Sequence, residues 1–107
     1  MNKIKFNVEE ENNFTFISFE SGIISPEDLA HLTPPKINET KGVVLSGRGP
    51  IWLYCFLTHF YHPTKFIATY DPRLEGAVVV ETHAVEHQIG SVLKCQQGGK
   101  EKINHGI

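Results

Sequence analysis

Residues 41–70 read KGVVLSGRGPIWLYCFLTHFYHPTKFIATY, and this stretch decides the fold. Its first six and last six residues are short runs rich in β-branched and aromatic side chains, which favour strands. Between the two runs, a loop of glycine and proline precedes an apolar segment. This predicts a helix that begins at Pro50 and ends by His62, before the next proline. A strand, a helix and a second strand predict a βαβ crossover between parallel strands.

Further elements flank this unit on both sides. Apolar residues alternate at positions 3–8 and 14–19, which predicts an amino-terminal β-hairpin. Ser25 and Pro26 are typical of the N-cap and first residue of a second, short helix. After the crossover, residues 77–83 are expected to pair back on the preceding strand as a hairpin. The predicted class is therefore α/β, with a mixed sheet, an N-terminal β-hairpin and two helices.

Composition predicts one domain over residues 1–107, in which residues 95–107 are expected to form a mobile tail. The 107 residues are 40% hydrophobic and 21% charged, and a chain of this length and composition is able to bury a hydrophobic core without disulfide bonds or structural metals. Cys55 and Cys95 are far apart and lack disulfide or zinc spacing, which predicts a reducing, cytoplasmic setting. The apolar run 51–57 is too short to cross a bilayer, so no membrane partner is expected.

The net charge conceals a basic segment. The chain carries a formal charge of −2, which argues against tight binding to duplex DNA or anionic lipid. Residues 41–73, however, hold both arginines of the chain, two of its lysines and a single acid, Asp71. This distribution favours a small, compact anion with a few phosphates.

The loop between the first strand and the helix is a candidate anion site. Glycines let the backbone approach a ligand, a helix N-terminus offers free N–H groups, and an arginine donates in bidentate fashion to phosphate. The alternative is a tight structural turn with an exposed arginine. The loop consists of Ser46, Gly47, Arg48, Gly49 and Pro50.

Three histidines form a candidate metal site. His59 and His62 are three residues apart near the helix end and share one helical stripe, so both are able to bind one ion. His83, at the end of the last predicted strand, supplies a third nitrogen ligand. The alternative is that histidines in a last helical turn simply interact with the negative end of the helix dipole.

Topology places these two candidate sites apart. A βαβ unit leaves the sheet at one edge and re-enters it at the other, so Arg48, Asp71 and Arg73 are expected at the edge opposite the histidines. A helix of roughly 12 residues separates the two sets by about 18 Å. One copy is therefore not expected to bring both sets onto one substrate, and joint action would require two copies stacked face to back.

Four ordered motifs resemble a known family. They are SGRGPIW at residues 46–52, HFYH at 59–62, YDPR at 70–73, and GAVVV at 76–80 followed by His83. Together they resemble the CRISPR-associated ring nuclease family three, also called Csx-three. The resemblance implies a Rossmann-like domain that acts as a homodimer, with two dimers enclosing the ligand. It also implies binding of cyclic tetra-adenylate or short oligoadenylate RNA, and cleavage with Mn²⁺.

The same resemblance implies a role for each residue of the motifs. His62, Asp71 and His83 would be required for cleavage, with His59, His62 and His83 around the metal. The loop at residues 46–50 would cradle phosphates together with Arg73. The departure from the family pattern is Glu75, which lengthens the turn after Asp71.

Two other functions are compatible with the same residues. The first is a sensor or sponge that binds the cyclic oligonucleotide with little turnover. The second is an exoribonuclease that removes 3′ adenosines from short RNA through the same site. Incubation with and without Mn²⁺ separates a sponge from an enzyme, and the rates on cyclic and linear RNA rank the two enzymes.

Overall fold

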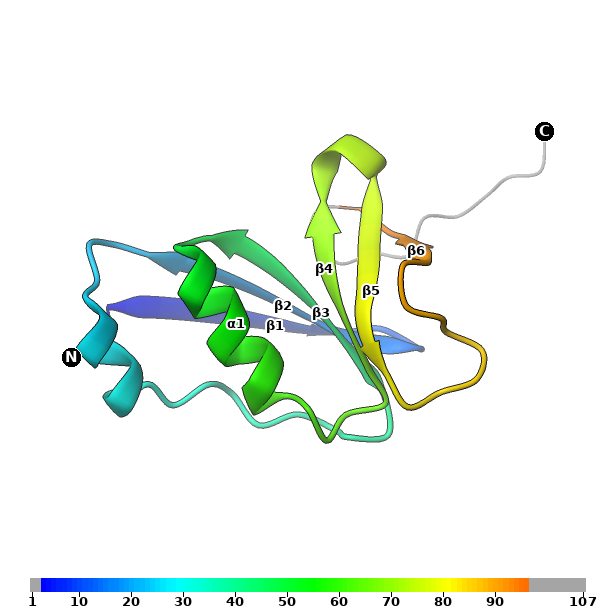
Figure 1. Ribbon diagram of the computed structural model, residues 1–107, viewed down its shortest axis with the longest axis horizontal. Coiled ribbons are helices and arrows are strands. Elements are labelled where there is room, and N and C mark those ends of the chain that lie inside the picture. Colours follow the sequence, from blue (N-terminus) through cyan, green and yellow to red (C-terminus); the bar gives the residue numbers. More distant parts are fainter. Residues whose placement is uncertain (1–2, 97–107) are drawn as a thin grey trace.

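Six strands form a single sheet whose spatial order follows the sequence (Figure 1). The structure is a computed structural model that describes residues 3–96. Its elements, in chain order, are β1 (Ile4–Glu10), β2 (Phe14–Ser21), η1 (Pro26–His31), β3 (Gly42–Arg48), α1 (Ile51–Phe60), β4 (Phe66–Asp71), η2 (Pro72–Leu74), β5 (Gly76–Thr82) and β6 (Val92–Lys94). The domain is therefore a small mixed α/β unit.

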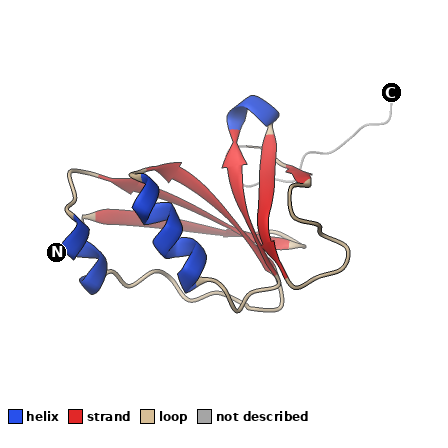
Figure 2. Cartoon of the chain, in the orientation of Figure 1, coloured by secondary structure: helices blue, strands red, loops and turns tan. Residues whose placement is uncertain are grey.

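The predicted crossover and both hairpins are confirmed. β2, β3 and β4 run parallel to one another, while β1 pairs antiparallel with β2 and β5 with β4. α1 lies across one face of the sheet, between β3 and β4 in sequence (Figure 2). Leu53 and Leu57, one turn apart on this helix, are fully buried against that face.

Hydrophobic side chains pack on both faces of the sheet. On the helix face, the core includes Ile17, Val43 and Leu45 together with the two helical leucines. On the opposite face, Phe16 and Val44 pack with apolar residues of β4 and β5. Alternation along β2 and β3 sends successive side chains to opposite faces, so Ile17 and Leu45 are buried on the helix face while Phe16 and Val44 are buried on the other.

Several predicted boundaries are corrected by the structure. The short helix predicted from Ser25 and Pro26 is a 3₁₀-helix, η1, which the prolines that follow it cut short. Pro50 is the N-cap of α1 and not its first residue, and α1 ends at Phe60, two residues before His62. The helix ends early because Tyr61 leaves the helical region and donates its hydroxyl to the Pro35 carbonyl at 2.6 Å.

The carboxy-terminal part of the described chain contains a strand that the sequence did not predict. β6 has only three residues and pairs antiparallel with β5, through Val92 with Val78. The predicted tail at 95–107 lies mostly outside the described residues. Within residues 3–96, no helix combines the length and hydrophobicity needed to span a membrane.

β3 and β4 pair over a short distance only. Their parallel register covers three positions, from Val43 with Ile67 to Leu45 with Thr69. Beyond this point the two strands diverge, and the β4–β5 hairpin leans away from β3 (Figure 1). The carboxyl ends of β3 and β4 therefore lie at the same edge of the sheet but apart from each other.

Candidate functional site

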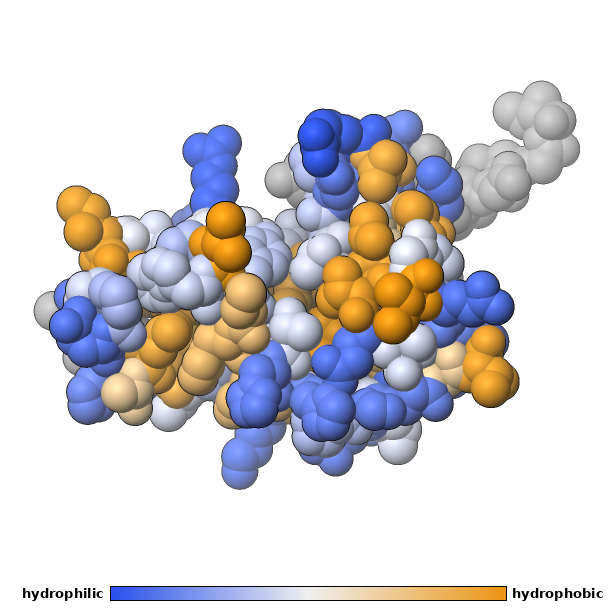
Figure 3. All heavy atoms as spheres, viewed as in Figure 1, coloured by the Kyte–Doolittle hydropathy of each residue, from blue (hydrophilic) through white to orange (hydrophobic). Residues whose placement is uncertain are grey.

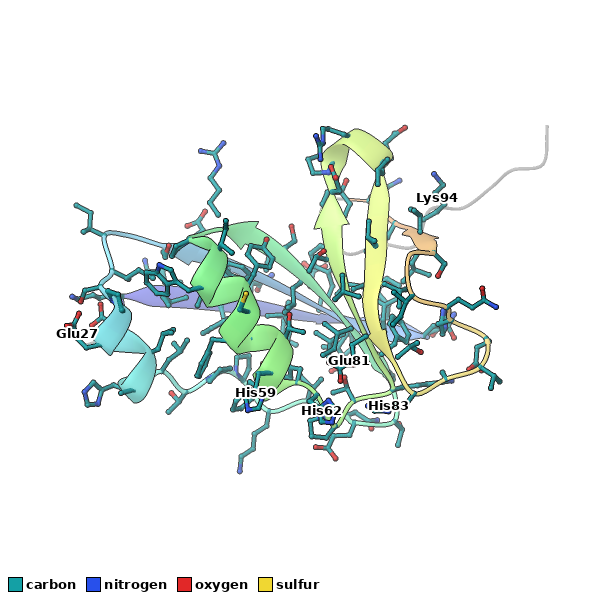
Figure 4. The ribbon with its side chains drawn as sticks, in the orientation of Figure 1. Glu27, His59, His62, Glu81, His83 and Lys94 are labelled. Carbon is teal, nitrogen blue, oxygen red and sulfur yellow. The ribbon has the colours of Figure 1, made fainter. Side chains whose placement is uncertain are left out.

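Three side chains with metal-binding atoms converge at the end of the sheet where β4 begins. His62, Glu81 and His83 each place a ligand atom within 4.8 Å of the other two (Figure 4). Glu81 Oε2 contacts His62 Nδ1 directly and lies 3.7 Å from His83 Nε2. The two imidazole rings are 5.2 Å apart at an angle of 77°. The two histidine side chains are about half exposed, so an ion from solvent can reach them.

A compact turn after α1 positions His62. Thr64 is buried and donates its hydroxyl to the Tyr61 carbonyl at 2.7 Å, which closes the turn around His62. The His62 carbonyl oxygen lies 3.1 Å from His83 Nε2, which brings the His83 ring against this turn. The backbone N–H of His83 donates to the Lys65 carbonyl, which fixes His83 beside the start of β4.

Glu81 is the residue of this cluster that sequence reasoning missed. Simple alternation along β5 would place Glu81 on the same face as Val79, which is buried opposite the helix. The register shifts at this point, because Ile67 pairs with Glu81 whereas Ala68 pairs with Val79. The bulge turns Glu81 toward the helix face, where it lines one hollow with Val80.

His59 lies beside this cluster and not within it. It sits in the last turn of α1 and lines the hollow that His62 and Glu81 also line. Its ring nitrogens are outside the group of three converging ligand atoms. The predicted helical stripe shared by His59 and His62 does not extend to His62, because the helix ends at Phe60.

Asp71 and Arg73 form a tight pair at the opposite end of β4. Arg73 donates from Nε to Asp71 Oδ1 at 3.1 Å and from Nη2 to Oδ2 at 2.9 Å, and its backbone N–H also donates to Oδ1. These hydrogen bonds from Arg73 lower the pKa of Asp71 below its ordinary value. The Arg73 side chain is 87% exposed, so its guanidinium faces solvent while it holds the carboxylate.

We expect the Arg73→Ala variant to raise the pKa of Asp71 toward the value of an unpaired aspartate, because the two side-chain hydrogen bonds and the positive charge are removed while the backbone N–H bond remains. The folded-state pKa of Asp71 lies below its unfolded value, so the pair stabilises the fold at higher pH. That contribution is lost as the pH falls through the folded-state pKa. A carboxyl carbon NMR titration of both proteins measures the change, and an unchanged Asp71 pKa would contradict the pairing.

The predicted anion loop lies at the same edge as Asp71 but on a separate surface. Ser46, Gly47 and Arg48 line a hollow of about 620 Å³ on the face opposite α1. A Cβ at Gly49 would come within 2.8 Å of a Leu53 methyl, so this glycine allows the loop to approach the helix. Pro50 caps the helix and completes the loop.

Two smaller hollows connect the acid–arginine pair with the histidine end. One is lined by Asp71 and Arg73 and the other by His59, His62 and Glu81, and Tyr54 and Thr69 line both. They lie between α1 and the β4–β5 hairpin, and Figure 3 shows hydrophobic side chains at the surface over that hairpin. The two sets stand at opposite ends of β4, as predicted, and the two hollows between them share Tyr54 and Thr69 in their walls.

Tyr54 also links this surface to the anion loop. Its hydroxyl donates to the Gly47 carbonyl at 2.7 Å, and its ring packs edge-on against Phe19. Burial raises the pKa of Tyr54, so the phenol stays protonated as a hydrogen-bond donor. One residue of α1 therefore fixes the backbone of the loop from the helix side.

Sequence comparisons place the chain in a known family. The family model described as CRISPR-associated protein (Cas_csx3) matches residues 17–94, which is well over half of the chain. The chain belongs to this family. The Csx3 match begins within β2 and ends with β6, so every residue of both candidate sites lies inside it. An uncharacterized protein from Aquifex aeolicus (strain VF5) is 48% identical over 99 residues, which cover 87% of this chain and 89% of that protein.

Proposed function

We propose that this Csx3-family protein is a Mn²⁺-dependent phosphodiesterase that binds and cleaves cyclic tetra-adenylate in the cytoplasm, on a Rossmann-like domain. The observation that carries the proposal is the convergence of His62, Glu81 and His83 at one exposed surface. Two imidazoles and a carboxylate, with room for water, are a donor set suited to manganese. The parallel strands β2 to β4, with a glycine-rich loop at their carboxyl edge, support the Rossmann-like relationship.

The cluster of three donors fits the proposed metal chemically. Glu81 supplies a negative charge between two neutral nitrogen donors, which offsets part of a divalent charge. A bound Mn²⁺ would polarise a phosphoryl oxygen or lower the pKa of a water molecule.

The remaining site residues of this protein have separable roles. Arg48 and Arg73 would hold phosphates, with Ser46 and the loop glycines at residues 46–50 offering close backbone approach. Asp71, with its lowered pKa, is ionised at neutral pH and would accept a proton from water or from a ribose hydroxyl; one of the histidines is the alternative base. His59 would support the metal from the neighbouring hollow.

The proposed assembly is a homodimer, with two dimers enclosing the ligand. Its support is the separation of His62, which precedes the first residue of β4, from Asp71, the last residue of that strand. In such an assembly the histidine end of one copy reaches the acid–arginine end of another. The cleavage rate would then rise faster than linearly with protein concentration at low concentration, whereas a strictly linear rate would contradict a shared site.

The test is incubation of the purified chain with cyclic tetra-adenylate, with and without Mn²⁺, followed by mass spectrometry of the products. We expect linear products only when the metal is present. Products with a plain terminal phosphate would identify water as the nucleophile, and a 2′,3′-cyclic phosphate would identify the ribose hydroxyl. An intact ring in both reactions would overturn the proposal, and faster cleavage of linear RNA than of the ring would reassign the substrate.

A further inference from the structure

The face of the sheet opposite α1 changes from apolar to polar along β2 and β3. Phe16 and Val44 are buried on this face, whereas the next positions on the same face are Ser18 and Ser46. The helix covers only the other face (Figure 1). The polar part of this face is therefore open, and it forms the hollow of about 620 Å³ at the carboxyl ends of β2 and β3.

Two rows of polar side chains cross this hollow in strict register. In the first row, Lys5 pairs with Glu20 across β1 and β2, and Glu20 pairs with Arg48 across β2 and β3. In the second row, Asn7, Ser18 and Ser46 are neighbours in the same way. All six residues line the hollow.

The charged side chains of the first row form no ion pairs within the described part of the protein. Among the residues that the structure describes, none of Lys5, Glu20 and Arg48 forms an ion pair, and all three are exposed. Neighbouring strands are about 4.8 Å apart, so the backbone positions of the two cations are about 10 Å apart, with the carboxylate residue between them. A carboxylate between two cations is complementary to a ligand that presents hydroxyl donors between negative charges.

We propose that this hollow is a ribonucleotide subsite, in which Glu20 accepts hydrogen bonds from ribose hydroxyls while Lys5 and Arg48 hold the adjoining phosphates. The proposal rests on the proposed function, since Arg48 also belongs to the phosphate loop. It goes further by naming the group that the protein recognises. The volume suits one nucleotide, because pockets for small ligands measure roughly 300–1,000 Å³.

The hydrogen-bonding chemistry of a carboxylate explains how Glu20 would distinguish ribose from deoxyribose. A carboxylate accepts hydrogen bonds only, and a ribose 2′-hydroxyl is a donor that deoxyribose lacks. Glu20 would repel phosphate, so its place between two cations is unfavourable for a site that reads charge alone. The row therefore predicts a preference for RNA over DNA of the same length and sequence.

The test measures binding without metal, by fluorescence anisotropy, of 5′-labelled tetra-adenylate in its ribose and deoxyribose forms. The wild-type protein is expected to bind the ribose form about tenfold more tightly. In the Glu20→Ala variant this ratio falls to about one, and Glu20→Gln, which keeps an acceptor without the charge, gives an intermediate ratio. Arg48→Ala weakens both ligands equally and leaves the ratio unchanged.

The matched control is Glu39→Ala, which removes the same charge from an exposed position outside the hollow and is expected to keep the wild-type ratio. Equal ratios in wild type and Glu20→Ala would overturn the subsite, even if the ring is still cleaved. A ratio that depends on Glu20 in a protein that cleaves nothing would uphold the subsite and reject the proposed function. The two proposals therefore fail separately.

Discussion

The Glu81→Gln variant is expected to lose at least about a hundredfold of the Mn²⁺-dependent cleavage rate. Glutamine has nearly the same shape as glutamate, but it removes the negative charge that lies between His62 and His83. It also replaces a strong metal ligand with a weak one. The side chain is about a quarter exposed, so the variant should fold normally. Single-turnover rates across a Mn²⁺ titration measure both the maximal rate and the apparent metal affinity.

His62→Ala removes one histidine of the cluster. Its matched control is His31→Ala, which removes a histidine of η1 away from the cluster. We expect His62→Ala to behave like Glu81→Gln and His31→Ala to behave like wild type. Binding of the ring should persist in all three proteins. Full activity of both Glu81→Gln and His62→Ala at low Mn²⁺ would contradict the assignment of this cluster.

The Leu57→Ala variant is expected to lose about 2–5 kcal/mol of the free energy of unfolding. Leu57 is fully buried between α1 and the sheet, and its loss leaves a cavity in the core on the helix face. The same helix carries Tyr54, which holds the anion loop, and His59. Urea unfolding followed by circular dichroism gives the change directly.

Ile51 offers the matched control on the same helix. Its side chain is 82% exposed, so Ile51→Ala should change the free energy of unfolding by no more than about 0.5 kcal/mol. A Leu57→Ala variant as stable as Ile51→Ala would contradict the packing of α1 on the sheet.

The crossover could be predicted because its signals are local. An aliphatic run at residues 43–45, a glycine and proline loop, and a proline after His62 mark the boundaries of β3 and α1 within two residues. β6 could not be predicted in this way. It has three residues, and its pairing with β5 is a tertiary contact that no local pattern specifies.

Topology alone was sufficient to predict which edge of the sheet each group of candidate site residues occupies. The histidine end and the acid–arginine end follow from the parallel crossover, which places strand ends at defined edges. Glu81 required knowledge of the bulge, because alternation assigns it to the wrong face. The available signal was its spacing of two from His83, which places both on one side of an extended chain.

The separation of β3 from β4 at their carboxyl ends could not be predicted from the sequence either. Topology predicted Arg48 beside Asp71 and Arg73, but the strands separate after Leu45 and Thr69. Arg48 consequently lines a different hollow from the other two. Sheet twist accumulates from many residues, and local patterns do not report it.

The most direct test of the central claim is Mn²⁺ binding at the cluster of His62, Glu81 and His83, measured by electron paramagnetic resonance of the free ion. The wild-type chain is expected to remove one equivalent of Mn²⁺ from solution, and the Glu81→Gln chain far less, in step with the loss of ring cleavage. Equal Mn²⁺ binding by both chains, or none by the wild type, would contradict the metal centre on which the proposed activity rests.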